Sequence, residues 1–332
     1  MRTNHDIKRG ITLYTFQDAY YFQKMDLEDL LAATADMGAE GVEIIPDQMI
    51  REFPDVSDAF IDQWHGMMER YGLTPTCMDD FVESQLYKHR KVSEDELVER
   101  FIRAARLANR LGCFIVREQF ALGGELMTPR LLERCLPHAE KYQIIIGLEV
   151  HAPNYLGNPE MDPYLEIMEK NPHAALIVDF SIFMHCFPKV INEFYLRQGV
   201  RKEVLDYANE AFRNRLGKDV VLKEAQKFRL TPIEEDLFAR QFRFNAYVEP
   251  ETMLEYKKFI KHFHAKTFGV SEDYVDDCID VPRVLKVIKE MGFKGYLNTE
   301  DEGNRYVHDA FEYDCIEQTR RHQKLLENIL GY

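Results

Sequence analysis

One phrase recurs along this chain: a helical pattern ends at a glycine, and a short β-rich apolar run follows. The phrase is present in MGAEGVEII, YGLTPTCM, LGCFIVR and MGFKGYLN. A glycine just past a helix adopts the left-handed conformation that turns the chain into the next strand. Short apolar runs that alternate with longer helical patterns are typical of repeated βα units, so we expect a parallel sheet.

Eight such runs are present, and several are too continuously apolar to alternate, as expected of strands covered on both faces. Eight strands and seven connections favour a (β/α)8 TIM barrel over an open sheet. A doubly wound sheet is the structural alternative, but no GxGxxG turn follows the first run to support nucleotide binding. The predicted strands are Gly10–Phe16, Gly41–Ile45, Thr74–Met78, Cys113–Arg117, Ile144–Val150, Ala175–Asp179, His262–Lys266 and Gly295–Thr299.

One connection is much longer than the others. About 80 residues separate the sixth and seventh runs, whereas the remaining connections span about 20 to 30. Because this segment follows the carboxyl end of a strand, a barrel places it on the active-site face. We therefore expect a single domain over residues 1–332 with a helical insertion at 181–258, which either fills space or acts as a lid or subunit contact. The predicted helices include Asp26–Met37, Ser93–Leu111, Lys202–Leu216 and Pro232–Arg243.

Composition narrows the classes of partner and compartment. With 42 Lys and Arg against 57 Asp and Glu, the formal charge is −15, which argues against sequence-independent nucleic-acid binding. No apolar stretch reaches the ~18 residues of a membrane helix or resembles a secretory signal, so a cytoplasmic protein is expected. Six scattered cysteines without a CxxC pair predict buried, reduced thiols rather than a zinc knuckle or a disulfide framework.

Polar residues stand at the ends of the last four runs, where barrel enzymes place their reactive groups. Glu149 ends the fifth run, Asp179 ends the sixth, His262 and His264 lie in the seventh, and Glu300 follows the eighth. Carboxylates and imidazole from four consecutive strands suit Mn²⁺, Mg²⁺, Co²⁺ or Zn²⁺. Three converging carboxylates would force a proton onto one of them unless a cation were bound, so the pattern predicts a divalent metal site.

Residues two apart on a strand share a face, so the sequence HFHAK predicts an inward polar column of His262, His264 and Lys266. One histidine would bind the metal, while the other would orient a carboxylate or contact the substrate. His151 lies two residues beyond Glu149, and neutral imidazole has a pKa suited to a general base. A structural role for His151, holding the loop HAPNY, is the alternative.

The segments GLEVH, IVDFS, HFHAK and GYLNTE resemble the metal-binding strands of the xylose isomerase-like barrels, the sugar isomerase and epimerase superfamily. The resemblance implies one divalent metal, often Mn²⁺, bound by Glu149, Asp179, His264 and Glu300, with His264 preferred over His262. Two departures are visible. Ile182 stands where the epimerases commonly have a histidine, and the extra histidine ligands of abasic-site endonucleases cannot be placed.

The chain also resembles the larger subunit of bacterial C-glycoside deglycosidases, in KRGITLYTFQDAYY, GVEIIPDQMI, WHGMMERYGLTPTCMD and GLEVHAP. This resemblance implies a metal-dependent carbon–carbon lyase that separates a 3-oxo-glucosyl group from a flavonoid-type aglycone by β-elimination. It also implies a small β-rich partner subunit in a hetero-oligomer. His151 is then the expected base, and the candidate substrate contacts are Glu43, Arg117, His262 and Lys266.

Two other functions share the same metal ligands or the same fold. A metal-dependent ketose isomerase or epimerase would use Glu149 and Glu300 as ligands and as proton carriers, and it needs only a small, closed, polar pocket. A non-enzymatic barrel retained as a partner subunit is the third hypothesis, and failure to bind metal would support it. Aromatic residues in the insertion favour a large flat substrate unless they form a core: Phe180, Phe183, Phe187, Phe194 and Tyr195.

Overall fold

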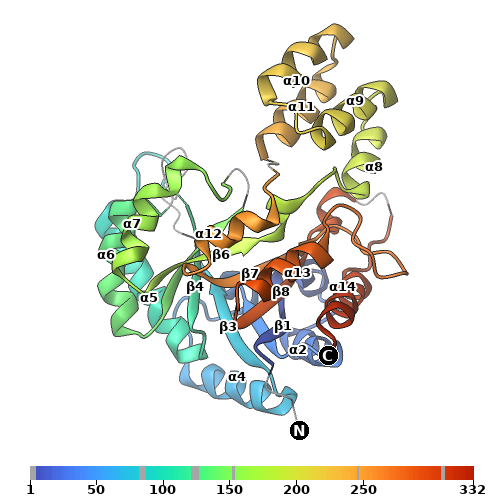
Figure 1. Cartoon of the computed structure of the whole chain (residues 1–332). Helices are drawn as coiled ribbons and strands as arrows, with labels where there is room; N and C mark the ends of the chain where they lie inside the picture. Colours follow the sequence, from blue (N-terminus) through green and yellow to red (C-terminus); the bar gives the residue numbers. More distant parts are fainter. Residues whose placement is uncertain (1–4, 82–86, 121–126, 152–153, 245–246, 308–310) are drawn as a thin grey trace.

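The computed structural model describes residues 5–81, 87–120, 127–151, 154–244, 247–307 and 311–332, and it forms a closed barrel of eight parallel strands in chain order (Figure 1). β8 pairs with β1 and closes the barrel. The predicted (β/α)8 fold is therefore confirmed. The strands are β1 (Ile7–Thr12), β2 (Gly41–Ile44), β3 (Thr74–Asp79), β4 (Ile115–Gln119), β5 (Ile145–Val150), β6 (Ala174–Asp179), β7 (Ile260–Thr267) and β8 (Gly295–Asp301).

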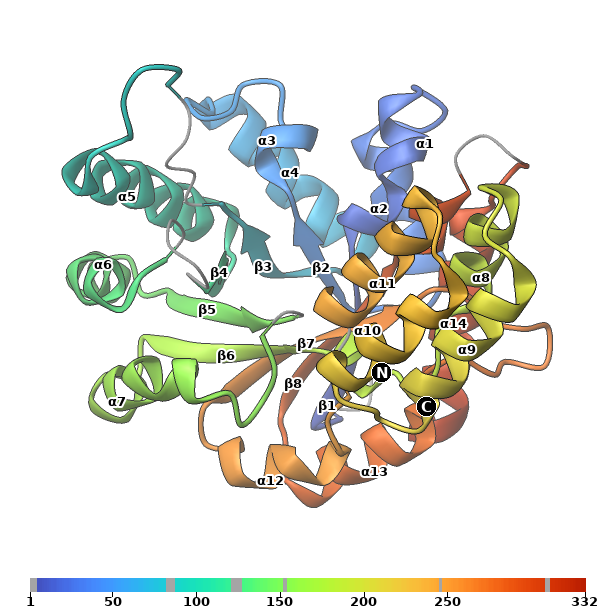
Figure 2. The same ribbon diagram turned by 90° about the horizontal axis from the view of Figure 1, so that it is seen from above.

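Helices surround the strands, and their buried apolar faces form one large core with the outer side of the barrel. The view from above shows them as a ring (Figure 2). They are α1 (Gln17–Tyr21), α2 (Leu27–Asp36), α3 (Pro46–Met49), α4 (Asp58–Tyr71), α5 (Glu94–Leu111), α6 (Pro129–Lys141), α7 (Asp162–Lys170), α13 (Val281–Glu290) and α14 (Cys315–Leu330). Short 3-10 turns are η1 (Leu13–Phe16), η2 (Pro159–Met161), η3 (Phe180–Phe183) and η6 (Gly303–Tyr306).

The glycine of each recurring phrase has the conformation that the sequence predicts. Gly72 and Gly112 follow α4 and α5 with φ of 62° and 79°, and Gly38 and Gly292 also have positive φ. Only glycine adopts this left-handed conformation without strain from a Cβ atom. These residues therefore set the direction in which each helix returns to the barrel.

In the connection between β6 and β7, α8 to α11 stand away from the barrel on the side of α14, whereas α12 lies against the barrel beside α13 (Figures 1 and 2). The helices α8 to α11 have an aromatic core of their own, in which the rings of Phe187 and Phe212 are 4.7 Å apart. Arg197 donates to the carbonyl of Tyr306 at 2.6 Å and so ties this segment to the turn after β8. The elements are α8 (Lys189–Arg197), α9 (Lys202–Arg213), α10 (Lys218–Ala225), η4 (Gln226–Phe228), α11 (Pro232–Phe244), η5 (Pro250–Thr252) and α12 (Met253–Tyr256).

One expectation needs correction, and one open alternative is decided. The first strand ends at Thr12, not at Phe16, because the Thr12 hydroxyl accepts a hydrogen bond from the Tyr14 amide and starts η1. The aromatic residues of the insertion do not line an open groove: Phe180, Phe183, Phe187 and Tyr195 are all buried. They form hydrophobic core, which is the alternative that the sequence left open: Phe187 packs within the insertion and Phe180 packs against Phe263 of β7. They therefore give no evidence for a flat substrate.

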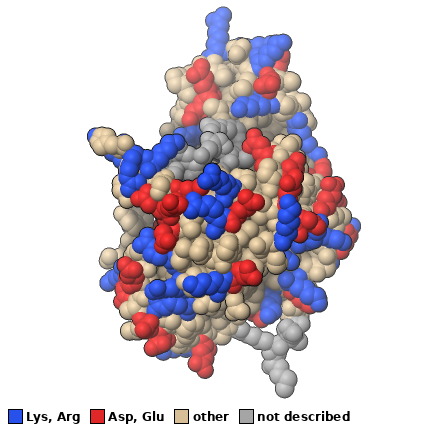
Figure 3. Space-filling view, turned by 90° about the vertical axis from the view of Figure 1, so that its left-hand side faces the viewer, with Lys and Arg blue, Asp and Glu red and all other residues tan. Residues whose placement is uncertain are grey.

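The distribution of charged side chains on the surface is consistent with the high content of charged residues in the sequence. Figure 3 shows acidic and basic side chains intermixed on the side of α5 to α7, where Arg134 pairs with Glu94 and Asp95. Among the described residues, none of the helices combines the length and the apolar character that a membrane crossing requires. The six cysteines are buried and free, as the sequence predicts.

Candidate active site

Four polar side chains meet where the last four strands end. Glu149 of β5, Asp179 of β6, His264 of β7 and Glu300 of β8 each offer a ligand atom, and these atoms lie within 4.8 Å of one another. All four side chains are buried. The structure thus brings together the residues for which the sequence analysis expects a metal site, and we call them the outer cluster.

Strand register explains this convergence. Asp179 lies opposite His264 in the β6–β7 ladder, and Glu300 lies opposite Lys266 in the β7–β8 ladder. Side chains on a strand alternate between its two faces, so His262, His264 and Lys266 follow one another up the inside of the barrel. All three are nearly or fully buried, which is the inward polar column that the sequence predicts.

Lys266 neutralises two carboxylates of the outer cluster. Its Nζ lies 3.3 Å from Asp179 Oδ2, 3.0 Å from Glu300 Oε1 and 3.2 Å from Glu302 Oε2. Burial raises the pKa of Glu300, but Lys266 and His264 outweigh it and hold that pKa at about 2. Glu300 is therefore ionised at neutral pH, as a metal ligand must be.

Arg117 of β4 neutralises the third carboxylate from the other side. Its guanidinium donates to Glu149 Oε2 and lies 3.7 Å from Asp79 Oδ1 at the end of β3. Burial raises the pKa of Glu149, but Arg117 and His264 outweigh it and hold that pKa well below its usual value. Arg117 is thus engaged with the protein's own carboxylates, and its predicted contact with substrate stays a prediction.

The outer cluster fits a divalent cation. One oxygen of Asp179 accepts a 2.7 Å hydrogen bond from the Ser181 amide, which leaves Oδ2 directed at the cluster without a hydrogen bond. Glu300 Oε2 is also buried without a hydrogen bond. A buried carboxylate oxygen without a hydrogen bond needs a positive charge beside it. Three carboxylates with one imidazole form a set of ligands suited to Mn²⁺ or a similar ion.

A second polar group lies one step deeper in the barrel. Glu43 Oε2 is 3.0 Å from His262 Nε2 and accepts a 2.8 Å hydrogen bond from Asn298 Nδ2. Asn298 donates also to Thr76 Oγ1 at 2.9 Å. We call Glu43, Thr76, His262 and Asn298 the inner cluster. All four are completely buried, so two of the predicted substrate contacts lie beneath the outer cluster and are bonded to one another.

His264 connects the two clusters. Its Nδ1 lies 2.7 Å from Glu149 Oε1 and 3.2 Å from Glu300 Oε2, and its Nε2 lies 2.9 Å from Glu43 Oε1. Burial lowers the pKa of His264, but the three carboxylates outweigh it and raise that pKa well above its usual value. A metal ion would therefore compete with a proton for Nδ1.

The predicted base lies beside the outer cluster. His151 directly follows β5 and is half-buried, and its charge acts on the pKa of both Glu149 and Asp179. Tyr14, from the turn after β1, also faces this region: burial raises the pKa of its phenol, and Glu302 raises it further. Arg305 stacks over the Tyr14 ring at 4.7 Å.

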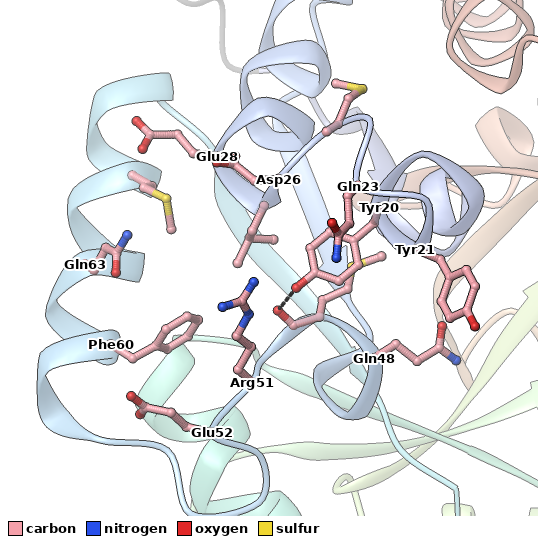
Figure 4. A pocket seen from close by; sticks show the side chains of 14 residues that line it. Tyr20, Tyr21, Gln23, Asp26, Glu28, Gln48, Arg51, Glu52, Phe60 and Gln63 are labelled. Atoms are coloured by element: carbon pink, nitrogen blue, oxygen red, sulfur yellow. Dashed lines mark hydrogen bonds between the residues drawn. The ribbon is translucent and has the colours of Figure 1, made fainter.

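One surface hollow is separate from the outer cluster. It has a volume of about 800 Å³ and lies between the α1–α2 segment and the α3–α4 segment (Figure 4). The Tyr20 hydroxyl closes its wall by donating to the carbonyl of Met49 at 3.0 Å. Arg51 and Phe60 line it, but no member of the outer cluster does. Its volume alone therefore gives no evidence about the reaction.

Sequence reasoning missed three residues near the site. Asn298 precedes Glu300 by two positions and so faces the same way, which the period of a strand could have revealed. Asp79 directly ends β3, but the apolar run before it stops at Met78 and hides it. Tyr14 was placed within a strand, although it belongs to the turn that follows.

Comparisons with known proteins agree with this geometry. The family model of the xylose isomerase-like TIM barrel matches residues 31–327. A C-glycoside deglycosidase alpha subunit from Arthrobacter globiformis is 30% identical over 98% of this chain and 92% of its own length. A 3'-dehydrocarminate deglycosidase alpha subunit from a Microbacterium species is 27% identical over 97% of this chain and 95% of its own.

The fold alone is shared with more distant solved structures. A sugar phosphate isomerase/epimerase from Parabacteroides distasonis superimposes with a TM-score of 0.57 at 15% identity, over 98% of this chain and 96% of that one. From the family model and the full-length relatives, the chain belongs to the xylose isomerase-like TIM barrels and, within them, to the group named C-glycoside deglycosidase alpha subunits.

Proposed function

We propose that this chain is the catalytic subunit of a metal-dependent C-glycoside deglycosidase. It would cleave the carbon–carbon bond between a 3-oxo-glucosyl group and a flavonoid-type aglycone. The observation that carries the proposal is the outer cluster, a buried set of three carboxylates and one imidazole, in a chain 30% identical over 98% of its length to a C-glycoside deglycosidase alpha subunit.

The reaction needs one base, which removes a proton from the sugar, and one acid, which donates a proton to the aglycone. A ketone at C3 of the sugar acidifies the proton on C2, and a base removes it. The C1–C2 double bond then forms as the C1–aglycone bond breaks, and the aglycone carbon takes up a proton. A divalent cation held by the outer cluster would supply Lewis-acid stabilisation of the charge that develops beside the C3 ketone.

His151 is our candidate for the base. It follows Glu149 by two residues, lies directly after the end of β5 and is half-buried. A group in this place could take the C2 proton of a sugar seated at the outer cluster. Tyr14, on the turn after β1, is a phenol that could return a proton to the aglycone.

Mn²⁺ is the metal we propose, with Mg²⁺, Co²⁺ and Zn²⁺ as alternatives, because oxygen donors predominate and one nitrogen completes the set. Lys266 would move from the carboxylates toward a substrate hydroxyl as the cation takes over their charge. Both relatives reported above are named alpha subunits. We therefore propose a smaller, β-rich second subunit in a hetero-oligomer.

The insertion at 181–258 is proposed to bound the entrance to the site. Arg197 of α8 is bonded to the Tyr306 carbonyl, and the ring of Phe194 is 5.9 Å from the Tyr306 ring. Tyr306 belongs to η6, the turn directly after β8 and Glu300. This contact supports a place for the insertion beside the mouth of the barrel.

The test combines elemental analysis of the purified protein with a screen of 3-oxo-C-glucosides and free ketoses, with and without any small protein encoded beside it. One equivalent of Mn²⁺ or a similar metal, with release of free aglycone, is the expected result. Isomerisation of free ketoses without aglycone release would replace the proposal with a sugar isomerase or epimerase. Absence of bound metal after incubation with Mn²⁺ would overturn both enzyme functions.

A further inference from the structure

Glu43 of β2 lies between the inner cluster and His264 of the outer cluster. Its side chain is 0% exposed, and its two oxygens face groups from two other strands. Oε2 is occupied by His262 and Asn298 of the inner cluster. Oε1 faces His264 Nε2 at 2.9 Å.

The two nitrogens of His264 face opposite surroundings. Nδ1 lies 2.7 Å from Glu149 Oε1 and 3.2 Å from Glu300 Oε2, whereas Nε2 lies 2.9 Å from Glu43 Oε1, in a group that also includes Asp79. A nitrogen that binds a metal carries no proton, so in neutral imidazole the proton must stay on the other nitrogen. A carboxylate accepts a hydrogen bond and cannot donate one while it is ionised.

We propose that Glu43 is a positioning residue that keeps the proton of His264 on Nε2 and presents a bare Nδ1 to a divalent cation in the outer cluster. The inference rests on the metal site of the proposed function. A carboxylate behind a metal-binding histidine fixes the ring orientation and strengthens the ligand. Glu43 would fill that role from the opposite wall of the barrel.

The inner cluster holds Glu43 in the orientation that this role needs. Asn298 uses one amide proton on Glu43 and the other on Thr76 at 2.9 Å, and the Thr76 hydroxyl donates to the Val42 carbonyl at 3.0 Å. Gly10 makes room for this network, because a Cβ at that position would lie 2.0 Å from Asn298 Oδ1. With Oε2 anchored, Oε1 is left for His264.

The test compares Mn²⁺ binding by the full-length wild type and by Glu43→Gln. The amide of the variant keeps the size of the side chain but can donate to Nε2, which favours a proton on Nδ1. We expect the dissociation constant for Mn²⁺, followed by electron paramagnetic resonance, to rise about 10- to 100-fold. Asp301→Asn is the control: it also turns a buried carboxylate into an amide, but on the outward face of β8 and away from the inner cluster, so it should leave Mn²⁺ affinity unchanged.

A second measurement needs no variant. In wild-type protein loaded with Zn²⁺, nitrogen-15 NMR of the histidine side chains should show His264 protonated on Nε2 and metal-bound through Nδ1. The reverse pattern would overturn the inference, as would equal Mn²⁺ affinity in a folded Glu43→Gln variant. In both cases metal binding by the wild type keeps the proposed function intact. Wild-type protein that binds neither Mn²⁺ nor Zn²⁺ would overturn the function together with the inference.

Discussion

The outer and inner clusters are built from the same residue types at neighbouring depths of one barrel, yet their hydrogen bonding differs. In the outer cluster, carboxylate oxygens of Asp179 and Glu300 are buried without a hydrogen bond and are compensated by Lys266. In the inner cluster, the single carboxylate, Glu43, is hydrogen-bonded at Oε2, while its Oε1 is buried without a hydrogen bond and lies 2.9 Å from His264 Nε2.

This difference suggests that the outer cluster binds a metal ion and that the inner cluster holds the metal ligands in position. Buried carboxylate oxygens without hydrogen bonds are costly, and several of them around one imidazole form a set that a divalent cation would stabilise. A carboxylate oxygen that is already hydrogen-bonded needs no cation, and its hydrogen bonds hold the neighbouring side chains in place. Substitutions in the outer cluster should therefore act on metal binding, and substitutions in the inner cluster should act on stability or, through Glu43, on the ligand His264.

The largest effect is expected from Asp179→Asn. The amide oxygen can still accept from the Ser181 amide, which supports the fold, but the NH₂ group now faces the cation site. Loss of a charged ligand should abolish stoichiometric Mn²⁺ binding and reduce turnover by a factor on the order of 10³ or more, because several kcal/mol of charge stabilisation is removed. Metal analysis and steady-state kinetics provide the measurement.

Asp301→Asn is the control for that variant. It makes the same chemical change one residue from Glu300, on the outward face of β8, where the carboxylate accepts from the Gly303 amide and the Tyr313 hydroxyl. It should keep the metal. If Asp179→Asn also kept its metal, the outer cluster would not be the binding site.

His151→Ala distinguishes catalysis from metal binding at the mouth of the barrel, because it removes the proposed base and leaves all four proposed metal ligands in place. Turnover should fall about 10²- to 10⁴-fold, the usual contribution of general base catalysis. Mn²⁺ content should stay at the wild-type level. A variant with normal turnover would return His151 to the structural role that the sequence left open, and Tyr14→Phe would then be the next variant to assay.

The outer cluster could be predicted from the sequence because each of its residues is recognised from the few residues around it. Glu149, Asp179 and Glu300 stand at the ends of recognisable strands, and parallel strands bring their carboxyl ends to one place. The eight strands and the glycine helix ends were equally visible, since each depends on a few consecutive residues. The insertion could be placed between the sixth and seventh strands for the same reason.

The inner cluster could not be predicted, because its meaning depends on which strands face each other across the barrel. Glu43 and His262 are 219 positions apart, and no periodic pattern relates them. No sequence pattern predicted that Arg117 would form ion pairs with Glu149 and Asp79. The aromatic residues near Phe187 likewise pack with partners on α9 and α11, and only the tertiary structure shows that pairing.

Gly10→Ala tests the claim that the inner cluster serves stability. The new methyl group would lie 2.0 Å from Asn298 Oδ1 and 3.1 Å from the Gly41 carbonyl, so the amide must move. Overpacking of this kind should lower the free energy of unfolding by about 1 to 3 kcal/mol. Chemical denaturation measures it. A variant as stable as the wild type would mean that the inner cluster adapts freely, contrary to its proposed rigidity.

The smallest effect concerns a third buried histidine, on the outer side of the same barrel wall. The Thr299 hydroxyl accepts a hydrogen bond from Gln323 at 2.8 Å and is hydrogen-bonded to His322 Nδ1, also at 2.8 Å. Burial lowers the pKa of His322 to about 3, whereas carboxylates raise that of His264. The unfolded chain therefore binds the His322 proton more tightly than the folded one, and stability contributed by this residue falls as the pH drops below about 6.5.

Between pH 7.5 and pH 5.5, this residue should lower the free energy of unfolding by about 1 kcal/mol. His322→Gln keeps a side chain that can bond to Thr299 but does not titrate, so denaturant unfolding at the two pH values should show a flatter dependence than in the wild type. The comparison at pH 7.5 controls for the cost of the substitution itself. An unchanged pH dependence would show that His322 is already protonated in the folded protein, and two buried histidines of one barrel wall would then carry the same charge despite their different surroundings.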